Sequence, residues 1–146
     1  HPADYRKDKR SSWISNSNIS TRLRALKSRH VIVVADSCYS GTLVRSVTTS
    51  VDSRSKDVRS LNLKRSRGAL TSGGLEQVVD SVGGNHSPFA KAFIDALNDN
   101  KNVVDMSSMY PEIRRSVLMS TDQSPVYSDI RKTGDEGGDF FFVRQR

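Results

Sequence analysis

The sequence has a single cysteine among its 146 residues, and this scarcity excludes a whole class of folds. One thiol cannot form a disulfide within the chain, so a small secreted scaffold held by disulfides is ruled out and a reducing compartment is favoured. The chain also has no apolar run near the ~20 residues that a membrane-spanning helix needs. Its start shows no basic segment followed by an apolar one, so we expect no signal peptide, no membrane partner and a cytoplasmic location.

Aromatic residues are scarce too, at 7% of the chain, and the net charge is +7. Where the aromatic residues lie helps to decide whether this charge indicates nucleic-acid binding. A basic protein has to be considered as a binder of nucleic acid. Much of the positive excess lies in residues 45–67, which contain no aromatic ring on which a base could stack and no apolar period. We therefore expect no nucleic-acid partner, and we predict that residues 45–67 form a long flexible basic loop.

The apolar pattern predicts alternating helices and strands within one domain. Helices are expected over residues 16–28 and over 107–119, where Pro111 is tolerated only in the first turn. A third helix is expected from Ser87 onward, because Ser87 is a cap residue followed by Pro88 and by an apolar stripe. Strands are expected over 31–35, 68–74 and 139–143. The run 31–35 is apolar at every position, as in a strand of a parallel sheet that is covered on both faces. The predicted class is α/β, with a mostly parallel sheet and helices on both faces.

Cys38 follows the first of these strands, in the stretch Asp36-Ser-Cys-Tyr-Ser-Gly41. In open α/β sheets the carboxyl ends of the strands border the crevice in which ligands bind, so this thiol is placed for chemistry. A lone cysteine is also a common core filler. A carboxylate at the end of an apolar strand needs a cation or hydrogen-bond donors as partners. Asp36 therefore either binds a cationic ligand in the crevice, or caps a helix, or pairs with an arginine of the fold.

The stretch from Asp36 to Gly41 resembles the nucleophile motif of the caspase/metacaspase superfamily of cysteine peptidases, in its metacaspase-like form. Four further blocks resemble successive blocks of bacterial caspase-like domains, in the same order: residues 13–16, 70–76, 86–90 and 137–140. The resemblance covers most of the chain. It implies a caspase-like three-layer sandwich, of which residues 1–146 form the C-terminal part of a single peptidase domain carrying only part of the sheet.

The same resemblance implies an activity and three site residues. Cys38 matches the nucleophile that attacks the peptide carbonyl and forms an acyl-enzyme. Asp36 matches the acid that lines the pocket for a basic P1 side chain, so the implied partner is a peptide or protein substrate with Arg or Lys at P1. Ser72 matches a position that borders the substrate channel, although a serine in a glycine-rich turn is equally a structural turn residue. An enzyme of this specificity would find P1 residues in its own loop 45–67, which we predict as a site of self-cleavage.

The chain departs from the family in its histidines. The family's catalytic histidine lies in a His-Gly motif roughly 40–50 residues before the cysteine, and this sequence contains no His-Gly pair. His30 opens the strand that Cys38 follows, which puts it roughly 20–26 Å from the cysteine, too far to act as the base. His86 is expected to cap a helix or to form a hydrogen bond. We therefore expect the base in a segment upstream of this chain, and the chain alone to be nearly inactive.

Two alternatives remain at the level of sequence. The chain could belong to a catalytically inactive caspase-like module that binds partners or scaffolds an assembly. Asp135, Glu136 and Asp139 could hold a calcium ion, which some metacaspases require, but their spacing is not that of a calcium loop. We expect a solvated acidic turn there, with no metal and no cofactor.

Overall fold

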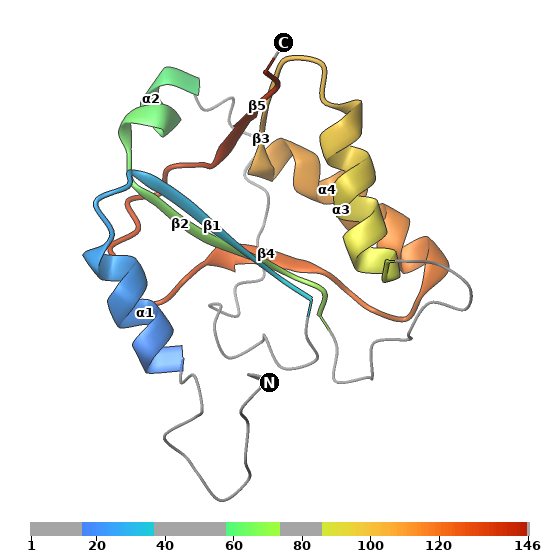
Figure 1. The fold of residues 1–146 in the computed structure, drawn as a ribbon, viewed down its shortest axis with the longest axis horizontal. Helices are drawn as coiled ribbons and strands as arrows, with labels where there is room; N and C mark the ends of the chain where they lie inside the picture. Colours follow the sequence, from blue (N-terminus) through green and yellow to red (C-terminus); the bar gives the residue numbers. More distant parts are fainter. Residues whose placement is uncertain (1–15, 37–57, 74–85, 146) are drawn as a thin grey trace, which may run out of the picture.

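The structure is a computed structural model that describes residues 16–36, 58–73 and 86–145 (Figure 1). Its elements follow in the order α1 (Asn16–Ala25), β1 (His30–Ala35), α2 (Val58–Leu63), β2 (Ser66–Thr71), α3 (Pro88–Asp99), β3 (Val103–Asp105), α4 (Met106–Ser120), β4 (Val126–Asp129) and β5 (Phe141–Val143). The predicted helices and strands are all present, whereas α2, β3 and β4 were not predicted. In the part of the chain that is described, no helix combines the length and the apolar character needed to cross a membrane.

Three strands form the main sheet in the order β1-β2-β4. β1 and β2 are parallel, with His30 opposite Ser66 and Ala35 opposite Thr71. β4 runs antiparallel to β2, and β3 pairs with β5 in a separate antiparallel sheet. The fold is therefore α/β, but the expectation of a mostly parallel sheet is wrong for the described strands. Hydropathy reports which residues are buried, whereas strand direction is set by the connections between elements.

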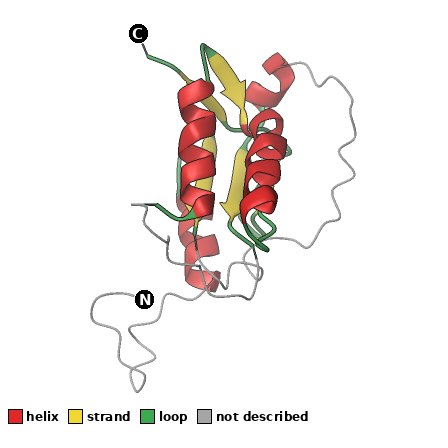
Figure 2. Ribbon diagram, turned by 90° about the vertical axis from the view of Figure 1, so that its right-hand side faces the viewer, coloured by secondary structure: helices red, strands yellow, loops and turns green. Residues whose placement is uncertain are grey.

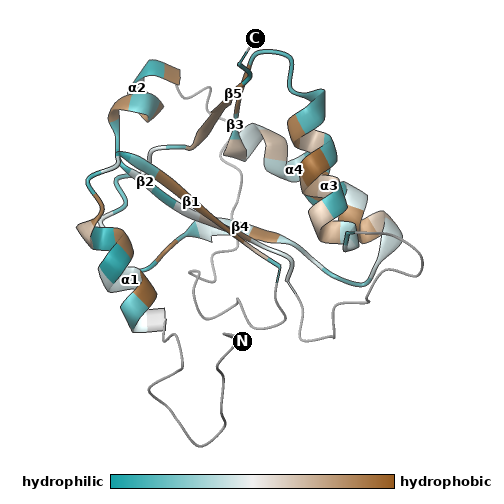
Figure 3. Cartoon of the chain, viewed as in Figure 1, coloured by the Kyte–Doolittle hydropathy of each residue, from teal (hydrophilic) through white to brown (hydrophobic). Residues whose placement is uncertain are grey.

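Helices cover both faces of the main sheet, because successive side chains of a strand point to opposite faces. Ile32 and Leu70 pack into a core formed with α3 and α4, while Val33 and Ala69 pack into a second core against α1. Figure 1 shows α1 on one side of the strands with α3 and α4 on the other, and Figure 2 shows α3 and α4 side by side in front of the strands. Hydrophobic residues run along β1 and β5 (Figure 3).

Arg67 on β2 has no solvent-exposed surface, although the sequence placed it in a loop. Its guanidinium donates hydrogen bonds of 2.6–3.3 Å to the backbone carbonyls of Leu23, Leu26, Ser28, Arg29 and Ser66. The last carbonyls of a helix have no partner within the helix itself. Arg67 supplies donors to the end of α1 and to the connection that follows it, and so ties α1 to the sheet.

The described part of the predicted flexible loop 45–67 is a helix and the start of a strand, so for these residues the prediction is wrong. Residues 45–57 lie outside the described residues. Val58–Leu63 forms α2 and Ser66 begins β2. This segment has no apolar period because α2 buries no side chain and because β2 contains the charged Arg67 at a fully buried position.

The caps at the starts of α3 and α4 explain where these helices begin. Ser87 accepts a hydrogen bond from the amide of Ala90 at 3.0 Å, as its predicted capping role requires. Asp105 caps α4 through the amide of Ser108 at 2.9 Å, so this helix begins at Met106. Pro111 consequently lies in the second turn, not in the first turn as expected, and the carbonyl of the residue four positions earlier lacks its usual amide donor.

Candidate functional site

The parallel pairing of β1 and β2 brings two of the three predicted site residues to the same edge of the sheet. Ala35 and Thr71 are paired at the carboxyl ends of the two strands, and Asp36 and Ser72 follow them directly. The amide of Ser72 donates to the carbonyl of Ala35 at 3.2 Å. Asp36 and Ser72 therefore lie on neighbouring strands at the edge where open α/β sheets bind their ligands.

The N-terminus of α3 reaches the same edge through Ser87. The hydroxyl of Ser87 donates a hydrogen bond to Oδ2 of Asp36. The side chain of Asp36 is exposed, and no ion pair with an arginine is found for it within the described residues. Two structural roles were considered for Asp36, pairing with an arginine and capping a helix. The first is not observed in that part of the chain. Asp36 does not cap a helix itself but accepts a hydrogen bond from Ser87, which caps α3.

Ser72 is fully buried, and its hydroxyl has no hydrogen-bond partner among the described residues. The tight turn after β2 depends instead on Gly73, whose φ of +68° belongs to the left-handed region. A Cβ atom at Gly73 would lie 1.8 Å from the carbonyl oxygen of Ser124, so only glycine fits. The hydroxyl of Ser72 is not used in shaping this turn, and a buried hydroxyl without a partner costs about 1–3 kcal/mol.

Cys38, the third predicted site residue, lies outside the described residues. In the sequence it stands two positions after Asp36. The structure thus brings together Asp36 and Ser72, and it adds Ser87, whose capping role was predicted but whose contact with Asp36 was not. Ser87 and Asp36 are 51 positions apart, and no local sequence pattern indicates that they are in contact.

The two described histidines occupy different positions relative to this edge. His30 is the first residue of β1, at the opposite end of the strand from Asp36. Its Nε2 lies 3.0 Å from the carbonyl oxygen of Asn62, and its ring stands edge-on to Phe141. His86 is exposed and precedes Ser87. The helix cap is Ser87, so a capping role for His86 is wrong.

Asp139 contradicts the expectation of a solvated acidic turn, because only 2% of its surface is exposed. Its carboxylate accepts hydrogen bonds from the hydroxyl of Tyr127 at 2.9 Å and from the amides of Ser107 and Phe140 at 3.2 and 2.7 Å. Burial, followed by the proximity of Asp139, raises the pKa of the Tyr127 phenol above its ordinary value. Asp139 therefore joins the start of α4 to β4.

The other two carboxylates of this turn bind the backbone at the start of β2. Asp135 accepts from the amide of Arg67 at 2.8 Å, and Glu136 accepts from the amide of Arg65 at 2.8 Å. Each of the three acids thus has its own protein donors. Within the described residues, no group of three or more potential metal ligands is found.

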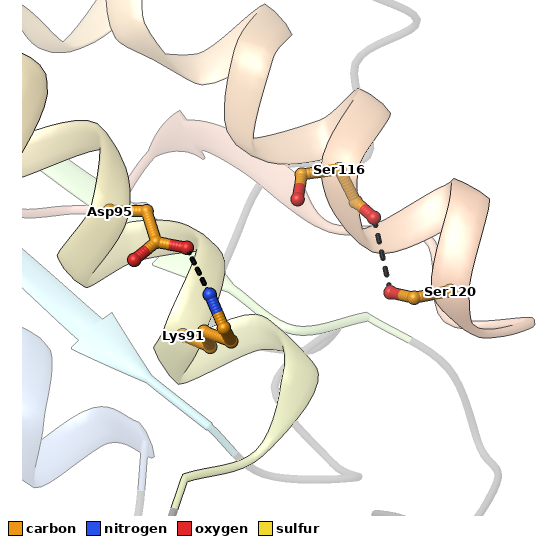
Figure 4. Close-up of polar contacts among 4 residues, drawn as sticks. All are labelled: Lys91, Asp95, Ser116 and Ser120. Atoms are coloured by element: carbon orange, nitrogen blue, oxygen red, sulfur yellow. Dashed lines mark hydrogen bonds and ion pairs between the residues drawn. The ribbon is translucent and has the colours of Figure 1, made fainter.

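Polar pairs on α3 and α4 have an ordinary local role (Figure 4). Lys91 and Asp95 form an ion pair of 2.5 Å between successive turns of α3, and the hydroxyl of Ser120 donates to the carbonyl of Ser116 on α4 at 3.1 Å. Both side chains of the ion pair are more than half exposed. Such helix pairs stabilise by about 0.3–0.5 kcal/mol, and we assign them no part in the site.

No family model matches this chain, and neither a curated protein nor a solved structure shows significant similarity to it.

Proposed function

We propose that this chain carries the nucleophile and the P1 pocket of a caspase-like cysteine endopeptidase that cleaves peptide bonds after Arg or Lys. The observation that carries the proposal is the position of Asp36 and Ser72, on neighbouring parallel strands at one edge of the sheet. Cys38 follows Asp36 in the motif that resembles the nucleophile motif of the family. The helices on both faces of the main sheet are compatible with a caspase-like sandwich.

The proposed reaction uses Cys38 as the nucleophile. Its thiolate attacks the scissile carbonyl carbon, a C–S bond forms, and the carbonyl oxygen becomes an oxyanion that the backbone N–H of Cys38 stabilises. Collapse of this intermediate breaks the C–N bond, and the leaving amine takes a proton from a histidine. Water then hydrolyses the thioester. In this proposal the histidine belongs to an upstream segment of the same domain, as the family resemblance implies.

Asp36 provides the charge that selects a basic P1 side chain. It is exposed at the strand edge, so a cation can approach its carboxylate. The hydroxyl of Ser72 has no partner among the described residues, but it is fully buried, so we assign the contact with the P1 cation to Asp36. A charge-assisted hydrogen bond to the P1 cation contributes about 1.5–3 kcal/mol, which corresponds to roughly 10–150-fold in kcat/KM.

The test is a P1 profile of the full-length protein, including the segment that supplies the histidine, on fluorogenic peptides that differ only in Arg, Lys or Asp at P1. We expect Arg and Lys peptides to be cleaved and the Asp peptide to be left intact. Cys38→Ala should abolish turnover, and Asp36→Asn should lower kcat/KM for Arg and Lys by roughly 10–150-fold.

Three outcomes would overturn the proposal. Undiminished turnover by Cys38→Ala would remove the thiol from the mechanism. A preference for Asp at P1 would contradict the assigned role of Asp36. Absence of hydrolysis by the full-length protein would favour the inactive, partner-binding module. The chain alone should be nearly inactive, because an unassisted thiol, with a pKa of ~8.5, is mostly protonated at neutral pH and has no acid for the leaving amine.

A further inference from the structure

We infer that Ser87 is a positioning residue that fixes the Asp36 carboxylate for the P1 cation, an inference that rests on the proposed function. Ser87 links two elements that meet at the edge of the sheet. Its hydroxyl donates to Oδ2 of Asp36, which follows β1, and accepts from the amide of Ala90, in the first turn of α3. This contact is the structural basis of the inference.

The two hydrogen bonds of Ser87 fix the direction of its proton. A serine hydroxyl has one proton and two lone pairs. The amide of Ala90 can only donate, so it occupies a lone pair of the hydroxyl, and the single proton points to Asp36. The backbone of Ser87, with φ of −61° and ψ of 158°, has the extended conformation typical of a helix cap. The donor is therefore held in place before any substrate arrives.

Asp36 needs such support because it is exposed and lies just beyond the last residue of β1. Its side chain would otherwise sample several rotamers, and a cation that binds it would have to overcome this loss of freedom. The bond to Ser87 involves Oδ2, and no described residue donates a hydrogen bond to Oδ1, which in this proposal meets the P1 cation. Restricting the carboxylate in advance lowers the cost of binding the P1 side chain.

The charge at the start of α3 favours the same arrangement. The N-terminal end of a helix carries a partial positive charge, which stabilises a nearby carboxylate. α3 spans 12 residues and has no acidic residue in its first turn. Asp36, from a different element, supplies the negative charge beside this helix end through its bond to Ser87. The carboxylate is thereby anchored to a rigid element of the fold.

A variant that separates the two roles of Ser87 tests the inference. Ser87→Gly removes the hydroxyl but retains a residue that is accepted at the cap with a loss of only a few tenths of a kcal/mol. Ser87→Thr retains the hydroxyl and serves as the rescue variant. Ser108→Ala is the matched control, because the hydroxyl of Ser108 donates to Asp105 at 2.8 Å at the start of α4, in a similar pairing of serine and aspartate.

Two measurements on the full-length protein are combined. The first is the separate determination of KM and kcat on an Arg peptide. The second is calorimetric binding of Nα-acetyl-arginine amide to the inactive Cys38→Ala form. We expect Ser87→Gly to raise KM and Kd about five- to tenfold with kcat within about twofold, because one hydrogen bond to a charged group is lost while the nucleophile is unchanged. Ser87→Thr and Ser108→Ala should behave like the parent protein.

The outcomes distinguish this inference from the proposed function. If Asp36→Asn loses binding of arginine amide but Ser87→Gly does not, Ser87 has no positioning role while the proposed function stands. If Ser87→Gly lowers kcat and thermal stability and Ser87→Thr fails to restore the parent values, its role is merely structural and the inference is wrong. If the parent protein binds no arginine amide, or if Asp36→Asn binds it equally well, the P1 role of Asp36 and the inference fall together.

Discussion

Two buried polar residues, Arg67 and Asp139, connect separate helices and strands of this protein through their side-chain hydrogen bonds. Arg67 donates to backbone carbonyls around the end of α1, and Asp139 accepts from three donors between β4 and α4. A buried charge is tolerated only when it is paired or hydrogen-bonded. Both residues therefore contribute to stability through contacts that a substitution would leave unsatisfied.

Replacing Arg67 tests this role at the scale of one residue. Arg67→Met keeps most of the side-chain volume but removes all the guanidinium donors that bind carbonyls around the end of α1. We expect a loss of about 2–4 kcal/mol in the free energy of unfolding, measured in urea. Arg131→Met, at an exposed position after β4, is the control and should stay within about 0.5 kcal/mol of the parent. Equal effects of the two variants would contradict the role of Arg67.

Tyr127 gives a prediction for the pH dependence of stability. Burial and Asp139 raise the pKa of its phenol, so the folded protein keeps the proton at a pH where the unfolded chain, with a pKa near 10, releases it. The stabilisation is therefore fully present below about pH 10 and is lost as the pH rises above that value. We expect Tyr127→Phe to be less stable than the parent by about 1–3 kcal/mol at pH 8.

The measurement compares the two proteins by urea unfolding between pH 8 and 11. The stability difference between parent and Tyr127→Phe should shrink above about pH 10, by up to ~1.4 kcal/mol for each pH unit. Other groups that titrate in this range are common to both proteins, so their contribution cancels in the stability difference between the parent and Tyr127→Phe. A difference that stays constant up to pH 11 would show that the phenol has no raised pKa.

At the scale of elements, the end of β2 is the most constrained turn that the structure describes. Gly73 and Gly137 both have positive φ, of +68° and +75°. A Cβ atom at Gly73 would lie 1.8 Å from the carbonyl oxygen of Ser124, whereas a Cβ atom at Gly137 would meet nothing within 4 Å. The two glycines share the conformational requirement and differ in the space around them.

Alanine substitutions at Gly73 and Gly137 separate the cost of backbone strain from the cost of steric overlap. Gly137→Ala should cost about 1–2 kcal/mol, the penalty of a left-handed conformation for a residue with a Cβ atom. Gly73→Ala should cost at least about 2 kcal/mol more, because the backbone of Ser124 has to move. Urea unfolding of both variants gives the comparison. Losses of the same size would mean that the contact between Gly73 and Ser124 is unimportant.

At the scale of the whole molecule, the packing narrows the predicted sites of self-cleavage. Arg67 is fully buried in the central strand, so a peptidase can reach it only after unfolding. Arg59 lies within α2. Lys64 and Arg65 are exposed between α2 and β2 and stay candidates. The other candidates, Arg45, Arg54 and Lys56, belong to residues 45–57, outside the described residues. We expect cleavage after one or more of these five residues and none after Arg67.

Intact mass and N-terminal sequencing of the full-length protein, beside its Cys38→Ala form, test this expectation. Fragments that begin after Arg45, Arg54, Lys56, Lys64 or Arg65 should form only when the thiol is present. Equal nicking in both proteins would indicate a contaminating peptidase, and a fragment beginning after Arg67 in folded protein would contradict the burial of that side chain.

The elements of the fold were largely predictable because their signals are local. The Ser87-Pro88 pair and the apolar stripe behind it predicted the start of α3, and the apolar run before Asp36 predicted β1. The family resemblance assigned Asp36 and Ser72 separately to the substrate pocket and channel, and the parallel pairing of β1 and β2 is what brings the two residues to one edge. The placement of Cys38 stays a prediction, as it lies outside the described residues.

By itself, the sequence determined where the chain forms its main helices and strands and which residues stand at the strand ends, because apolar spacing and caps act over a few neighbouring residues. Only the tertiary structure decided the antiparallel direction of β4, the burial of Arg67 and the bond between Ser87 and Asp36. Whether a polar side chain is buried depends on partners distant in sequence, 39 positions away for the bond from Arg67 to Ser28. Such partners satisfy its hydrogen bonds only once the chain has folded.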